Sequence, residues 1–84
     1  MVDGLEVALT ARQAAVLAAL IDSEGRVLSR PELLTMVWGD EPADEHAVEM
    51  TIGRLRSTLG AASGAIETVV KRGYRLAAPL IEQP

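Results

Sequence analysis

The 84-residue sequence lacks cysteine and phenylalanine, and it contains only one tryptophan, one tyrosine and one histidine. Without cysteine the chain cannot form disulfides or a thiolate metal site. A single histidine supplies neither a histidine metal cluster nor a robust Ser-His-Asp set. Because aromatic residues are so few, the core must be built from Leu, Val, Ile and Ala.

Long hydrophobic runs are also missing, since no apolar stretch approaches the roughly 18 residues of a membrane span. The first residues, MVDGLEVALT, have no basic segment and no long apolar core, so they do not form a secretory signal. The stretch GAASG lacks the Lys-Ser/Thr ending of a phosphate-binding loop. We therefore expect a cytoplasmic domain that does not contact a membrane, is not an enzyme and needs no metal or cofactor.

The net charge is −4, but the charge is unevenly distributed. Residues 46–76 carry five basic and two acidic side chains, whereas the rest of the chain carries three basic and ten acidic ones. An acidic balance alone argues against a nucleic-acid partner. The segregation of basic residues into the second half removes that objection.

Two capping boxes mark the first two helices. The stretch TARQ begins a helix predicted over residues 11–23, and SRPE begins a second over residues 30–38, which ends before Gly39. On the first helix the residues expected to share a buried face are Leu17, Leu20 and Ile21.

The third helix is predicted over residues 45–59, with Asp44 as its cap. Its apolar residues are spaced by 4, 3 and 4, which is the pattern of a helix with one buried face. They are Val48, Ile52, Leu55 and Leu59. Gly60 ends this helix, and residues 61–64 are expected to be a flexible link.

Strands are predicted at both ends of the domain. Residues 5–9 alternate apolar and polar side chains, and residues 66–70 and 73–76 form a hairpin in which Gly73 adopts a positive φ. We expect one α+β domain over residues 1–84, with its core at about 5–77. A three-helix core with a C-terminal β-hairpin wing and a residual N-terminal strand is a winged helix-turn-helix. Fold alone does not give function.

The outward face of the third helix points to DNA. It holds small residues and one arginine, where an ordinary solvated face would carry Glu, Lys and Gln. A helix of this kind fits the major groove, where Arg54 is able to contact guanine and Met50 a thymine methyl. Two alternatives remain open: a merely solvated Arg54 beside an incidental Gly53, or packing against a helix of another protein. The candidate base-facing residues are His46, Ala47, Met50, Gly53 and Arg54, with Ser57 beside them.

The predicted hairpin adds a second basic site. Lys71 and Arg72 lie at its tip and Arg75 on its second strand, where they suit DNA phosphates or the minor groove. The alternative is that these charges block edge pairing between strands.

Three further sites have two interpretations each. Arg56 lies nearer the buried stripe and serves either a structural salt bridge or a phosphate contact. Trp38 is interpreted as a core residue, with an indole N–H able to reach a phosphate as the alternative. The acidic loop over residues 39–45 is either solvated or meets a basic surface of a partner protein.

Several motifs together resemble one family. VLSR followed by LL and VWG, then RLR and LG, and finally GYRL resemble the OmpR/PhoB-type output domain of transcriptional regulators over about residues 3–77. Three positions depart from the usual pattern. Val70 and Lys71 stand where the family wing commonly has Arg and Gly, and Gly53 stands where a polar or basic residue is common.

The resemblance implies a sequence-specific double-stranded DNA-binding domain of a response regulator in a two-component system. It implies tandem or dimeric binding to direct repeats and an upstream receiver or other domain, so we expect the 84 residues to be an excised C-terminal portion of a longer chain. The alternative is a winged helix for protein contact or regulation, appended to an enzyme. By position, the residues implied for backbone contact or support are Trp38, Arg56, Ser57 and Thr68. Those implied for RNA polymerase contact are Asp40, Glu41 and Asp44.

Overall fold

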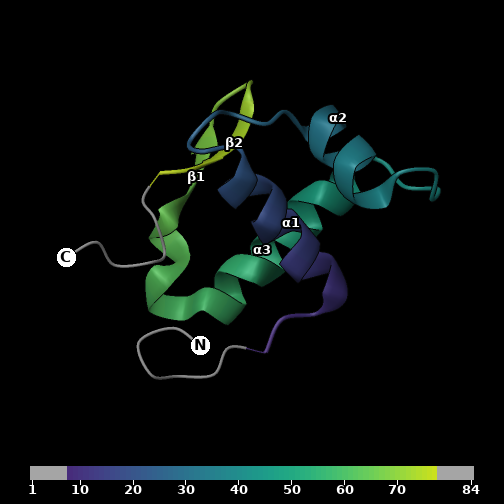
Figure 1. Ribbon diagram of the computed structural model, residues 1–84. Coiled ribbons are helices and arrows are strands. Elements are labelled where there is room, and N and C mark those ends of the chain that lie inside the picture. Colours follow the sequence, from purple (N-terminus) through teal and green to yellow (C-terminus); the bar gives the residue numbers. More distant parts are fainter. Residues whose placement is uncertain (1–7, 78–84) are drawn as a thin grey trace.

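The computed structural model describes residues 8–77, in which helices are followed by a two-stranded antiparallel hairpin (Figure 1). This order confirms the predicted α+β winged-helix arrangement. The elements are α1 (Ala11–Asp22), α2 (Arg30–Leu33), the π-helical turn η1 (Leu34–Trp38), α3 (Glu45–Leu59), the 3-10 helix η2 (Gly60–Ala65), β1 (Ile66–Val69) and β2 (Gly73–Leu76).

The three main helices begin at the caps predicted from the sequence. The Thr10 hydroxyl accepts a hydrogen bond from the Gln13 N–H at 3.1 Å, and the Gln13 side chain accepts one from the Thr10 N–H at 3.3 Å. Ser29 and Glu32 form the same reciprocal pair at the start of α2. Asp44 accepts from a first-turn N–H of α3 at 3.3 Å. Each cap satisfies backbone donors that have no partner inside the helix.

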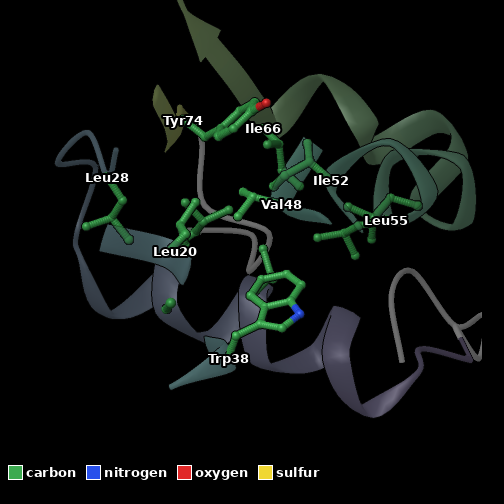
Figure 2. Close-up of a cluster of buried hydrophobic side chains, with 12 residues drawn as sticks. Leu20, Leu28, Trp38, Val48, Ile52, Leu55, Ile66 and Tyr74 are labelled. Atoms are coloured by element: carbon green, nitrogen blue, oxygen red, sulfur yellow. The ribbon is translucent and has the colours of Figure 1, made fainter. Parts of the chain in front are cut away.

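The core lies between the three helices and the hairpin, and Figure 2 shows α3 contributing several of its side chains. All four apolar residues of the predicted stripe on α3 are buried, which fixes the opposite face of that helix toward the surface. The fully buried aliphatic side chains of the core are Val16, Leu20, Leu28, Leu33, Val48, Ile52 and Leu55.

The loop between α1 and α2 is tied to the hairpin. The Leu28 N–H donates to the Tyr74 carbonyl at 2.8 Å, and the Tyr74 N–H donates back to the Leu28 carbonyl at 2.9 Å. Gly73 makes this approach possible, because a Cβ at that position would lie 2.0 Å from the Leu28 carbonyl oxygen. Its φ of +142° agrees with the predicted positive φ. The hairpin is therefore fixed to the helical core.

The predicted buried face of α1 is partly wrong. Leu20 is fully buried, but Leu17 is half-buried and Ile21 is 46% exposed. Val16 and Ala19 are buried in their place. Because α1 is apolar around most of its circumference, spacing alone does not identify the face that α3 covers.

Two predicted segments also differ. Residues 61–64 were expected to form a flexible link, but they belong to the 3-10 helix η2, and Ala62 packs against the core. The first hairpin strand ends at Val69, because the turn is closed by a hydrogen bond from the Arg72 N–H to the Val69 carbonyl. The predicted strand over residues 5–9 lies mostly outside the described residues, and residues 8–10 are not in a strand.

Candidate nucleic-acid interface

The outward face of α3 brings together most of the residues predicted to face DNA bases. His46, Met50, Gly53 and Arg54 are all exposed. Ala47 differs, because it is half-buried and packs against the core. It therefore lies on the flank of the helix, and the four others, with exposed Ser57, form the surface that a groove can approach. We call these five residues, without Ala47, the outer face of α3.

The cations of this region divide into paired and unpaired groups. Across residues 8–77, which include all eight basic side chains, Arg12, Arg30 and Arg75 form ion pairs with carboxylates. Arg54 on α3 and Lys71 and Arg72 at the hairpin turn are exposed, and the described acids form no ion pair with them. The unpaired charges are thus available to an anionic partner. A fourth exposed cation without an ion pair to the described acids, Arg26, lies in the loop after α1.

Arg56 connects α3 to the hairpin. Its guanidinium donates to the Ile66 carbonyl at 2.7 Å and to the Thr68 hydroxyl at 2.9 Å, and it lies 5.8 Å from the centre of the Tyr74 ring. The hypothesis of a salt bridge was wrong in its partner, because Arg56 bonds to a carbonyl and a hydroxyl rather than to a carboxylate. Thr68 accepts this bond and keeps its own hydroxyl proton free to donate.

Arg75 has a different position from the other two basic residues of the wing. It is half-buried, and its guanidinium pairs with Glu67 at 3.2 Å and donates to the Gly25 carbonyl at 3.2 Å. It therefore holds the hairpin against the loop that follows α1. Lys71 sits at the tip of the turn with a φ of +65°, and its side chain is exposed.

Trp38 is buried at the end of η1, which confirms its interpretation as a core residue. The Arg12 guanidinium lies over its ring, 4.7 Å from the centroid. Arg12 also donates to the Val37 carbonyl at 2.9 Å and pairs with Glu41 at 2.8 Å. One arginine thereby joins α1 to the beginning of the acidic loop.

The acidic loop is exposed, and two of its three predicted contact residues have partners within the domain. Glu41 pairs with Arg12, and Asp44 caps α3. Asp40 is exposed and forms no ion pair with a described cation.

A cleft of about 240 Å³ lies between α3, the start of α2 and the hairpin turn. Among the residues that line it are Arg30, Glu49, Thr68 and Tyr74. The hydrogen bond that Arg30 donates to the Glu49 carboxylate raises the pKa of Arg30 above its ordinary value, and Glu45 lies 3.5 Å from the same guanidinium. Burial raises the pKa of Tyr74, so its hydroxyl stays protonated at neutral pH.

Arg30, Glu49 and Tyr74 were not identified as site residues from the sequence. Arg30 and Glu49 are 19 residues apart on different helices, so no local spacing predicts their ion pair. The position of Tyr74 depends on the bridge to Leu28, which is likewise a tertiary contact.

The position of α3 beside the hairpin, with unpaired cations on both, defines a winged-helix DNA-binding domain. No helix within residues 8–77 has the length and apolarity needed to cross a bilayer. The chain belongs to the family described as transcriptional regulatory protein, C terminal, whose model matches residues 4–76.

Similarity to individual proteins supports this assignment. The chain is 47% identical over 64 residues to the transcriptional regulatory protein PrrA of Mycobacterium leprae, an alignment that covers 75% of the chain and 28% of that relative. The solved DNA-binding domain of Escherichia coli CadC matches with a TM-score of 0.83 and 34% identity, over 92% of this chain and 76% of that one. The DNA-binding domain of the response regulator AdeR, solved with an intercistronic region, matches with a TM-score of 0.78 and 25% identity, over 88% and 76% of the two chains.

Proposed function

We propose that this domain binds double-stranded DNA sequence-specifically as the output domain of a transcriptional response regulator. The outer face of α3 enters the major groove, and the turn at residues 70–72 lies against the neighbouring backbone or minor groove. The observation that carries the proposal is the placement of the unpaired cations Arg54, Lys71 and Arg72 on two elements that Arg56 joins directly. An acidic chain that leaves these three charges free presents a local attraction for phosphate.

The residues divide into groups by the part of the DNA they are suited to contact. Arg54 is able to donate two hydrogen bonds to guanine O6 and N7, and His46 and Met50 reach neighbouring base edges. Lys71, Arg72 and the Thr68 hydroxyl are suited to phosphate oxygens, which position the protein without specifying sequence. Trp38 and Arg56 support this surface from behind, as their buried and hydrogen-bonded positions suggest.

The parent protein is proposed to be longer. Because the chain spans only 28% of the length of PrrA, we place an upstream receiver domain before it, which controls binding of two copies to direct repeats. We assign Asp40 at the exposed part of the acidic loop to contact with RNA polymerase. The protein-contact alternative has less support, because the matching relatives are named as transcriptional regulators.

The test is to select binding sites from a random duplex library and to measure affinity for the selected site with Arg54→Ala. We expect a loss of about 1–3 kcal/mol and relaxed preference at one base pair. The matched control is Arg26→Ala, which removes an unpaired exposed arginine outside α3 and the hairpin and leaves the base preference unchanged. Identical base preferences for the wild type and Arg54→Ala, or no selected site at all, would contradict the proposal.

A further inference from the structure

Gly53 lies in the middle of α3, where glycine has no structural reason to be. Its backbone is helical rather than left-handed, and a Cβ built there would meet nothing within 4 Å. Gly73 is the opposite case, because a Cβ there would collide with the Leu28 backbone. Glycine in a helix interior destabilises the helix relative to alanine. The missing side chain at position 53 is therefore unexplained by either the conformation or the packing of the domain.

The surroundings of Gly53 on the surface are specific. Met50, one helical turn earlier, is 43% exposed, so its apolar side chain is available at the surface. Arg54 follows directly and forms no ion pair with the described acids. The outer face of α3 thus has a gap at its middle, next to an exposed apolar thioether and a free cation.

We propose that Gly53 is a specificity-determining position, at which the gap in the α3 outer face admits the C5-methyl group of one thymine against the helix backbone and the Met50 side chain. The thymine methyl is the apolar group that base pairs present in the major groove. A Cβ at position 53 would occupy the volume that this methyl needs. The inference rests on the proposed function, since it requires α3 to lie in the major groove.

The chemistry also explains why the gap is useful beside Arg54. A helix without a side chain at position 53 approaches the groove floor more closely, which shortens the reach that Arg54 needs to a neighbouring guanine. Van der Waals contact with a methyl group is short-ranged, so it discriminates thymine from cytosine only at such close approach. Gly53 would therefore specify one thymine directly and improve the contact of Arg54 with the adjacent base pair.

The experiment combines a protein change with a DNA change. In the selected site each thymine is replaced in turn by deoxyuridine, which lacks the methyl group and keeps the hydrogen-bonding pattern. For the wild-type 84-residue chain we expect one replacement to weaken binding about fourfold, from about 0.8 kcal/mol per buried methylene-sized group. Gly53→Ala should bind the thymine site more weakly and show a thymine-to-uracil affinity ratio close to 1 at that position. Met50→Ala should reduce the same ratio.

Gly64→Ala is the matched control. Gly64 lies in η2, where an added Cβ also meets nothing within 4 Å, and it is outside the outer face of α3. This variant should keep the wild-type affinity and the fourfold ratio. Because alanine is the better helix former, Gly53→Ala is expected to fold, so weak binding will not reflect unfolding.

The outcomes separate the two proposals. If the wild type selects a specific site but Gly53→Ala keeps the wild-type ratio at every thymine, the inference about Gly53 is overturned and the proposed function stands. If the wild type selects no specific site, the proposed function fails and the inference fails with it.

Discussion

Arg56 and Ile66 join the two halves of the proposed DNA-binding surface: the guanidinium on α3 donates to the carbonyl at the start of β1 at 2.7 Å. Ile66 is 2% exposed, so water has little access to this region when the donor is removed. The contact fixes the position of the hairpin relative to α3. DNA binding requires this fixed position if α3 lies in the major groove and the hairpin turn lies in the neighbouring groove.

Arg56→Met should therefore lower the stability of the domain. It keeps an unbranched stem and removes the donor, and leaving a buried acceptor unpaired costs about 1–3 kcal/mol. The loss is measured as the free energy of unfolding in urea. If Arg56 served only to contact phosphate, Arg56→Met would leave the free energy of unfolding unchanged and would weaken the salt dependence of DNA binding.

Glu49→Gln should strengthen DNA binding. In the free domain Glu49 pairs with Arg30 beside the cleft that faces the hairpin turn, so its charge opposes an approaching phosphate. Neutralising it leaves Arg30 with only the longer contact to Glu45, at 3.5 Å. The dependence of log K on log salt should then steepen by up to about 0.9, the value for one more neutralised phosphate. Asp40→Asn is the control, because it removes one negative charge from the acidic loop, where Asp40 forms no ion pair with a described cation. A slope equal to that of the wild type would show that Arg30 does not reach the DNA.

Two glycine substitutions should change stability in opposite directions. Gly53→Ala should stabilise the fold by about 1 kcal/mol, because the added methyl meets open space on a helix. For a domain of this size that is a rise in Tm of roughly 4–8 °C. Gly73→Ala should lower the Tm, because its Cβ would overlap the Leu28 carbonyl. Calorimetry on both variants checks the pair, and a lower Tm for Gly53→Ala would contradict the open surroundings of that position.

The cap of α2 should make stability sensitive to acid. Hydrogen bonds from Ser29 hold the pKa of Glu32 below its ordinary value near 4.5. A lowered pKa in the folded state means that the ionised carboxylate stabilises the fold above the unfolded pKa, and that this contribution is lost as the pH falls through the folded value. Glu32→Gln keeps an acceptor and removes the titration. Urea midpoints between pH 7 and pH 3 should fall less for Glu32→Gln than for the wild type, and identical curves would contradict the assignment.

The parts that the sequence predicts well are those determined by local chemistry. Asp44 as a cap, the stripe from Val48 to Leu59 and the stop at Gly60 depend on neighbouring residues, and the bounds of α3 agree with them. The buried face of α1 was less predictable, because its alanines and leucines make several faces equally apolar. The same distinction applies to the site.

Arg54 and the turn cations follow from the helix period and the hairpin pattern. Whether a cation is free or already bonded within the domain depends on partners from distant segments. Examples are the ion pair of Arg30 with Glu49 and the hydrogen bond of Arg56 to the Ile66 carbonyl. Those partners depend on how α2 and the hairpin pack against α3. That packing is a property of the whole fold and has no signal at a fixed spacing.

The salt dependence of DNA binding tests the central claim most directly. Affinity for the selected site is measured over a series of salt concentrations for the wild type and for the double variant Lys71→Ala/Arg72→Ala. If both cations neutralise phosphates, the slope of log K against log salt should be shallower in the variant by about 1.8, at roughly 0.9 for each charge. The same slope for both proteins would contradict the account, because the unpaired cations of the hairpin turn would then have no part in binding DNA.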